Sequence, residues 1–155
     1  MADHHLIRGC SIGRPIGPQD VLERPCEVLI PAACEAQVTA DHAGRLDCKL
    51  IVEAANGPTT PAADAILAAR GIGVVPDVLA SAGGVVISYF EWVQDIQRYA
   101  WTTDQFNTRL RSHMKEGLDR VVEKAEHLRI DWRTAALAVA VERVADAARS
   151  RYIYP

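Results

Sequence analysis

The sequence predicts an α/β fold in which helices pack against a small parallel sheet, and three observations favour it. Short apolar runs alternate with helical stretches between residues 25 and 98, the order expected of parallel strands joined by crossover helices. The apolar runs show no polar alternation, which is typical of strands that helices cover on both faces. The rest of the chain carries only helical periodicity.

The alternating region contains successive strand-and-helix pairs. We expect strands at residues 28–30, 50–52 and 72–75, and helices from 35 to about 41, from 62 to 70 and from 79 to about 97. Asn56 and Gly57 suit a turn that needs a positive φ. Thr60 and Pro61 suit the start of a helix, because Thr caps free amides and Pro lacks the donor that the first turn leaves unused.

The C-terminal region predicts two helices. Thr102 with Gln105 resembles a capping box, and apolar residues then recur at helical spacing to about Leu128. A break at Ile130 precedes an alanine-rich helix over residues 133–149, with Asp131 as its N-cap. Two consecutive helices with so short a connection should form a helical hairpin.

The N-terminal region predicts no regular element. Residues 1–24 hold a dense set of backbone breakers, namely Gly9, Gly13, Pro15, Gly17 and Pro18. We therefore expect an irregular lead-in there. The full length of 155 residues suits one domain or a piece of a larger one.

Composition and charge exclude several classes of protein. The net charge of −3 provides no general field that would attract nucleic acid. The longest wholly apolar run has seven residues, 135–141, far below the roughly 20 that span a bilayer. Residues 1–5 lack the pattern of a secretory signal. We therefore expect a cytoplasmic protein with no nucleic-acid or membrane partner.

The residues that commonly bind metals show no ligand spacing. The cysteines, at positions 10, 26, 34 and 48, lie 16, 8 and 14 residues apart, which matches neither a zinc pair nor a redox CxxC motif. His42, His113 and His127 have no carboxylate or thiol at ligand spacing, and His4-His5 suits a frayed terminus. We expect free thiols and no metal.

Polar side chains follow the second expected strand, at residues 51–61. The carboxyl end of a parallel strand is where open α/β sheets bind ligands. The alternative is an ordinary strand-to-helix turn capped by Thr60. Glu53 and Asp77, near two strand ends, could act as acid–base groups, but a carboxylate that caps a turn is commoner, so neither is assigned a catalytic role.

Residues 76–92 contain two adjacent glycines in a helical run. Gly83 and Gly84 should each cost about 1 kcal/mol against alanine, so a ligand or a closely packed helix is expected beside them. Ser88 lies one turn after Gly84, which favours either a substrate contact or a hydrogen bond to a carbonyl one turn back. The aromatic residues at 89–92 indicate packing in a core or a subunit contact.

Four segments in order resemble a known family: LIPAA (29–33), VEAANGPTT (52–60), PDVLASAGGV (76–85) and RTAA (133–136). From about residue 20 to 155 the chain resembles the C-terminal part of the glutamate dehydrogenases, within the Glu/Leu/Phe/Val dehydrogenase superfamily. The segment SYFEWVQ (88–94) resembles the glutamate enzymes more than the branched-chain or phenylalanine ones.

The resemblance implies a fold and its division. The expected architecture is the second half of a Rossmann-like parallel sheet, with about three strands, followed by the helical hairpin. Residues 25–98 would form a partial dinucleotide-binding domain after the lead-in at 1–24. Residues 99–155 would return towards a substrate domain that precedes this segment in the family.

The resemblance also implies an activity and its site residues. Family members oxidatively deaminate an amino acid, here L-glutamate, to 2-oxoglutarate and ammonium, with NAD or NADP as cofactor. Asn56, Ala32 and Ala33 would border the cofactor, and Ser88 and Val85 would contact the glutamate side chain.

The resemblance leaves the chemistry of this segment incomplete. The family's catalytic lysines and aspartate and its glycine fingerprint precede the part seen here, so no catalytic residue is expected in this chain. The family commonly has Asn where this chain has Ser81, and the shorter side chain reaches less far towards the cofactor.

Two hypotheses about function follow from this resemblance. The chain is either the C-terminal portion of a working glutamate dehydrogenase or a catalytically silent, truncated module that binds or modulates a full-length dehydrogenase. In both cases the strand at residues 28–30 lacks its usual neighbour. We therefore expect a fragment that forms a homo-oligomer or associates with the missing N-terminal part.

Overall fold

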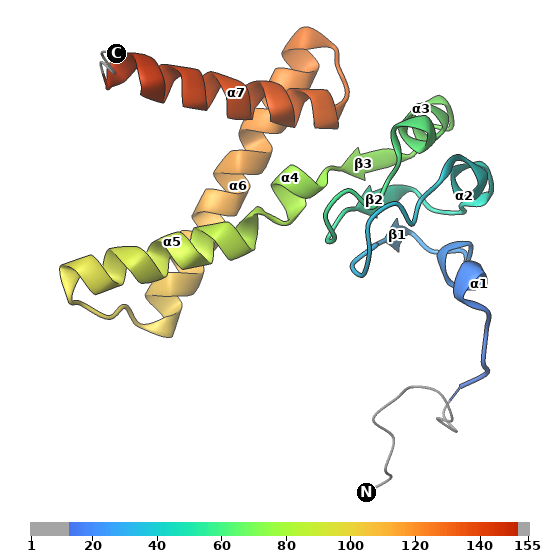
Figure 1. The fold of residues 1–155 in the computed structure, drawn as a ribbon, viewed down its shortest axis with the longest axis horizontal. Coiled ribbons are helices and arrows are strands. Elements are labelled where there is room, and N and C mark those ends of the chain that lie inside the picture. The colour runs from blue at the N-terminus through green and yellow to red at the C-terminus, as the bar shows by residue number, and fades with distance from the viewer. Residues whose placement is uncertain (1–12, 152–155) are drawn as a thin grey trace, which may run out of the picture.

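The structure, a computed structural model, describes residues 13–151 (Figure 1). His4-His5, Gly9 and Cys10 lie outside the described residues. The elements are α1 (Pro18–Leu22), β1 (Val28–Leu29), α2 (Ala40–Arg45), β2 (Leu50–Val52), α3 (Pro61–Ala69), β3 (Gly73–Val75), α4 (Asp77–Ala80), α5 (Ala82–Gln97), α6 (Thr103–Leu128) and α7 (Trp132–Ser150). Figure 1 shows the strands with α1 to α3 at one end and α5 to α7 at the other.

The strands form one parallel sheet in the order β1-β2-β3, which confirms the α/β class and the expected half of a Rossmann-like sheet. Leu29 of β1 pairs with Ile51 of β2, and Ile51 pairs with Val74 of β3. β2 is therefore the central strand, and β1 lies at an edge as the sequence predicted.

One face of the sheet packs on α2 and α3. The buried residues of this core are Val38, Ala43, Leu46, Ile51, Ala63, Leu67 and Ile72. Among the strand residues, Ile51 alone is fully buried. The prediction that the strands are buried on both faces is therefore wrong for the described chain, since its helices form this core on one face.

The prediction of an irregular lead-in over residues 1–24 is wrong for residues 18–22, which form the short helix α1. Pro18, counted among the backbone breakers, starts this helix, because proline suits a first turn that has no use for its missing amide.

The segment before α2 differs from the prediction. A helix was expected from residue 35 to about 41, but α2 begins only at Ala40. Ala36 has a positive φ of 51°, and Val38 forms an isolated parallel bridge with Thr59. This backbone pairing, in which the Val38 amide donates to the Pro58 carbonyl at 2.8 Å, replaces helical hydrogen bonds over the first residues of the segment.

The single helix expected from residue 79 to 97 is divided. α4 ends at Ala80 and α5 begins at Ala82, with Ser81 between them. The Ser81 hydroxyl donates to the carbonyl of Glu53 at 3.4 Å. The start of α5 therefore lies beside the end of the central strand.

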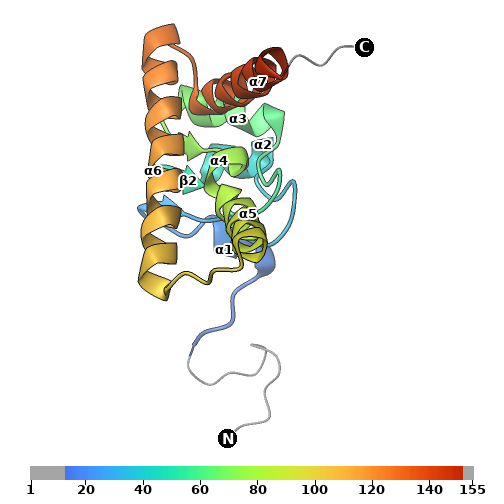
Figure 2. The same cartoon turned by 90° about the vertical axis from the view of Figure 1, so that its left-hand side faces the viewer.

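The helical hairpin and both of its caps are confirmed. Thr102 and Gln105 form the predicted capping box of α6, and the Asp131 carboxylate accepts from the Thr134 amide at the start of α7. The core between the helices consists of Val121, Ala125, Ala135 and Ala136. Figure 2 shows α7 beside the end of α6 that leads into it. Within the described residues, no helix combines the length and apolar character needed to cross a membrane.

The aromatic residues of α5 divide between two faces. Phe90 is buried between α5 and α6 and makes edge-to-face contacts with Trp101, Phe106 and His113. The opposite face is exposed and forms an apolar stripe, here called the α5 stripe, that consists of Val85, Tyr89, Trp92, Ile96 and Tyr99. The packing interpretation therefore holds for Phe90 but not, within this chain, for Tyr89 and Trp92.

The open β1 edge and the α5 stripe predict that the isolated chain self-associates, because both surfaces gain by leaving water. Size-exclusion chromatography with light scattering should give a mass above that of a monomer, rising with concentration. Trp92→Glu should lower this mass, whereas Leu118→Glu, an exposed change on α6 outside the stripe, should not. A compact monomer at all concentrations would contradict the prediction.

Candidate functional site

The loops after β1 and β2 meet at the carboxyl edge of the sheet. The Pro31 carbonyl accepts hydrogen bonds from the amides of Ala54 and Ala55, each at 3.0 Å. Ala32 and Ala33, which follow Pro31, and Asn56, which follows Ala55, are exposed. The structure thus brings the three predicted cofactor residues to one edge of the sheet.

The turn that carries Asn56 is held by the start of α4. Gly57 has a φ of 53°, as its turn position requires. Its amide donates to Asp77 Oδ2 at 2.7 Å, and Asp77 Oδ1 accepts from the Val78 amide at 2.7 Å. Thr60 caps α3 as predicted, accepting from the Ala63 amide at 3.3 Å.

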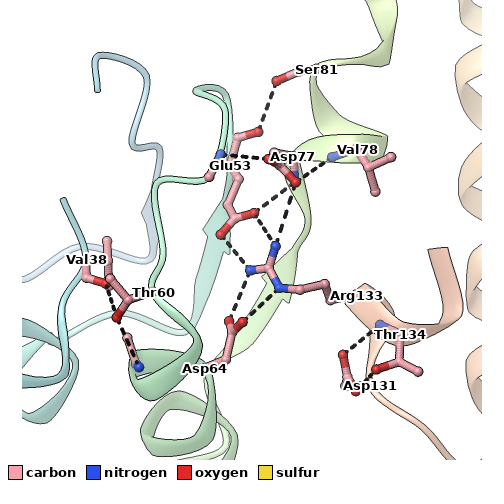
Figure 3. Close-up of polar contacts among 12 residues, drawn as sticks. Val38, Glu53, Thr60, Asp64, Asp77, Val78, Ser81, Asp131, Arg133 and Thr134 are labelled. Carbon is pink, nitrogen blue, oxygen red and sulfur yellow. Dashed lines mark hydrogen bonds and ion pairs between the residues drawn. The ribbon is translucent and has the colours of Figure 1, made fainter. Parts of the chain in front are cut away.

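A cluster of one arginine and three carboxylates lies behind this turn (Figure 3). Arg133 donates to both oxygens of Glu53 at 2.9 and 2.7 Å. It also donates to both oxygens of Asp64 at 2.8 and 3.0 Å. The third carboxylate, Asp77, lies 3.7 Å from Arg133 Nη1. We call Glu53, Asp64, Asp77 and Arg133 the Arg133 cluster.

Burial makes the Arg133 cluster a strong constraint. The Glu53 side chain is 0% exposed and that of Arg133 is 25% exposed. The hydrogen bond with Glu53 raises the pKa of Arg133 above its ordinary value, against burial, which lowers it. A buried ionised carboxylate without its partner is costly, so Glu53 needs Arg133. In these contacts Glu53 pairs with Arg133 and Asp77 holds a turn. This agrees with the interpretation of the sequence that assigned neither carboxylate a catalytic role.

Sequence reasoning missed Arg133 and Asp64 as parts of this cluster. Arg133 lies in the first turn of α7, where the helix dipole disfavours a cation. A cation at such a place indicates a carboxylate from elsewhere in the fold. The position of Arg133 in the first turn could therefore be read from the sequence, but it did not identify Glu53, 80 residues away, as the partner.

The predicted substrate residues lie on the first turns of α5. Val85 is 75% exposed, and Ser88 is also exposed. The Ser88 hydroxyl donates to the Gly84 carbonyl at 3.2 Å, which is the hydrogen bond to a carbonyl one turn back that the sequence allowed. Val85 and Ser88 therefore face the surface of the described chain.

The two glycines beside these residues differ in their surroundings. A Cβ at Gly83 would lie 3.9 Å from Met114 Sδ, which is ordinary contact, and one at Gly84 would meet nothing within 4 Å. Close helix packing therefore does not explain Gly84. Open space remains where its side chain would be.

A separate cavity of about 450 Å³ lies between α3, β3 and the start of α7. Its lining includes Asp64, Trp132 and Arg133, but not Asn56 or Ser88. Within residues 13–151, no group of three or more His, Cys, Asp or Glu side chains is arranged to hold a metal ion. Cys26, Cys34 and Cys48 are free thiols.

Comparisons with known proteins point to one family. Residues 8–151 match the family model described as Glutamate/Leucine/Phenylalanine/Valine dehydrogenase. The chain is 49% identical over 153 residues to a glutamate dehydrogenase of Thermotoga maritima, covering 99% of this chain and 37% of that protein. It is 47% identical over 136 residues to an NAD-specific glutamate dehydrogenase of Staphylococcus aureus, covering 88% of this chain and 33% of that protein.

Solved structures show the same likeness. The fold is similar to a hetero-hexameric glutamate dehydrogenase from Thermus thermophilus, with a TM-score of 0.88 and 36% identity over 96% of this chain and 36% of that one. The chain spans about a third of the length of the relatives that it matches. Since the family model matches nearly the whole sequence, this chain belongs to the Glu/Leu/Phe/Val dehydrogenase family.

Proposed function

We propose that this chain supplies the second half of the cofactor-binding sheet, and one wall of the substrate site, of an NAD(P)-dependent glutamate dehydrogenase. The proposed reaction of the whole enzyme is oxidative deamination of L-glutamate to 2-oxoglutarate and ammonium. The family match and the relatives named as glutamate dehydrogenases support this reaction. The observation that carries the proposal is the family match over residues 8–151, and the open space beside Gly84, next to Val85 and Ser88, leaves room for a ligand at the proposed substrate contacts.

The carboxyl edge of the sheet suits a dinucleotide. Ala32 and Ala33 are small and exposed, so a flat ligand could approach the backbone closely, and the exposed Asn56 offers a carboxamide that both donates and accepts. Bound there, NAD or NADP would supply the hydride acceptor of the reaction. The name of the Staphylococcus aureus relative, NAD-specific, favours NAD.

The first turns of α5 suit the glutamate side chain. An alanine in place of Gly84 would favour the helix by about 1 kcal/mol, and no atom of the described chain stands in its way. A substrate in that space accounts for the glycine. Ser88 would then release the Gly84 carbonyl and donate to the side-chain carboxylate, while Val85 would shape the pocket.

This proposal divides the work between two parts of the whole enzyme. Residues 25–98 form the part that binds the cofactor and also carry the proposed glutamate contacts on α5. Residues 99–155 return towards a substrate domain that brings the catalytic acid–base groups. The α5 stripe, which begins with the proposed substrate residue Val85, supports association with that domain or with another copy of the chain. The cytoplasmic location expected from the sequence stays part of the proposal.

The second candidate function is a catalytically silent module that binds or modulates a full-length dehydrogenase. The exposed α5 stripe and the β1 edge favour it, because both would be available to a partner chain. Measurable glutamate-dependent reduction of NAD(P) by the purified 155-residue chain alone would exclude this alternative.

A chimera tests the proposed function. The matching segment of the Thermotoga maritima relative, 49% identical over 153 residues, would be replaced by this chain in one polypeptide. We expect glutamate-dependent reduction of NAD(P), with the unaltered relative as control. A chimera that folds and assembles like the control yet shows no turnover would contradict the proposal.

Gly84→Ala separates stability from substrate binding. In the isolated chain it should raise the free energy of unfolding by about 0.5–1 kcal/mol, measured by urea denaturation, because alanine favours the helix. In the chimera it should raise KM for glutamate several-fold, because the methyl group fills the proposed site. Gly83→Ala is the matched control, with the same helix gain and no effect on KM. An unchanged KM in Gly84→Ala would count against the site.

Ser88→Ala tests the carboxylate contact. Loss of a hydrogen bond to a charged group should lower kcat/KM for glutamate in the chimera about 10- to 100-fold. The unfolding free energy should change by no more than about 0.5 kcal/mol, since the side chain is exposed. Ser112→Ala, at an exposed serine on α6, should leave kcat/KM unchanged. Equal kinetics for the two variants would remove Ser88 from the site.

A further inference from the structure

Arg133 reaches the turn that carries Asn56 through a continuous series of short contacts. Glu53 Oε2 accepts from Arg133 Nη1 at 2.9 Å and also from the Asp77 amide at 2.9 Å. Asp77 Oδ2 in turn accepts from the Gly57 amide at 2.7 Å. A side chain of the last helix is thus linked to the backbone next to Asn56. Figure 3 shows the Arg133, Glu53 and Asp77 part of this series.

The guanidinium is oriented from its other side. Asp64 on α3 accepts from Nε and Nη2 at 2.8 and 3.0 Å. This fork leaves Nη1 and Nη2 directed at Glu53, which accepts from both. A lysine carries the same charge but offers a single flexible ammonium, so it could not hold both carboxylates in this geometry.

We propose that Arg133 is a positioning residue for the cofactor edge: it fixes Glu53 and Asp77, and through them the place of Gly57 and Asn56. The assignment rests on the proposed role of Asn56 in cofactor binding. Arg133 does not need to touch the cofactor or the substrate in this role, because it acts on the turn only through Glu53 and Asp77.

A purely structural role, in which Arg133 only attaches α7, makes a different prediction. α7 also packs on α6 through Val121, Ala125, Ala135 and Ala136. If Arg133 only attached α7, any weakening of the start of α7 would disturb the turn equally. Asp131→Ala provides that comparison. The Asp131 carboxylate caps α7 by accepting from Thr134 and from the backbone amide of Arg133, so its loss weakens the start of α7 and removes none of the four side chains of the cluster.

Hydrogen exchange of the full chain, read by mass spectrometry at the Gly57 amide, tests the proposal without any ligand. Arg133→Lys should accelerate exchange of this amide about 10- to 100-fold, the effect of losing a hydrogen bond to a charged acceptor. Amides of the β2–β3 ladder should stay within about twofold of the wild type, the range allowed for an intact sheet. Asp131→Ala should leave the Gly57 amide unchanged.

Three results would overturn the assignment. The first is an unchanged exchange rate of the Gly57 amide in Arg133→Lys. The second is an acceleration of this amide in Asp131→Ala as large as that in Arg133→Lys. The third is an acceleration in Arg133→Lys that is the same for all amides of the chain. Asp64→Asn is a second variant in case Arg133→Lys fails to fold, because the buried Glu53 keeps its hydrogen bonds with Arg133. Asp64→Asn should accelerate exchange of the Gly57 amide less than Arg133→Lys does. An unchanged exchange rate of this amide in Asp64→Asn would also overturn the proposal.

In the chimera, Arg133→Lys should raise KM for the dinucleotide more than it lowers kcat. Equal kinetics of Arg133→Lys and the parent chimera would overturn the positioning role. An inactive parent chimera would contradict the proposed function alone, because the Gly57 exchange experiment needs no activity.

Discussion

The ion pair between Arg133 and Glu53 is the interaction on which the arrangement of this chain depends. It joins residues 80 positions apart and connects the last helix to the end of the central strand. Glu53 is fully buried, so separating the pair would leave a buried carboxylate with no cation to balance its charge. Because Glu53 also accepts from the Asp77 amide, the same pair connects the end of β2 to the start of α4.

Some apolar surfaces of the chain are covered by its own helices, and others are exposed. The sheet face under α2 and α3 and the junction of α6 with α7 are closed by their own side chains. Within residues 13–151, the β1 edge, the α5 stripe and the space beside Gly84 are open. These open surfaces agree with a chain that spans about a third of the length of its relatives, and they are where the proposed ligands and partner chains would lie.

The sequence predicted much of what local physics determines, although the short helix α1 was missed. The caps at Thr60, Thr102 and Asp131 depend on residues a few positions away, and all three are present. The expected helix over residues 35–41 was wrong because pairing of Val38 with Thr59, a long-range contact, outweighs local helix propensity. The burial of the strands was overestimated because it also depends on long-range contacts, namely on which helices pack against each face of the sheet. The partners of Arg133 lie 69 and 80 residues away, beyond any pattern of spacing.

The central proposal is that Asn56 borders a bound dinucleotide and that Ser88 contacts the side chain of glutamate in the whole enzyme. The most direct measurement is a crystal structure of the chimera with dinucleotide and glutamate bound. The account predicts the Asn56 carboxamide within hydrogen-bond distance of the dinucleotide, and the Ser88 hydroxyl turned from the Gly84 carbonyl, which it contacts at 3.2 Å here, to the carboxylate of glutamate. Both side chains facing bulk solvent, with the ligands bound elsewhere, would contradict it.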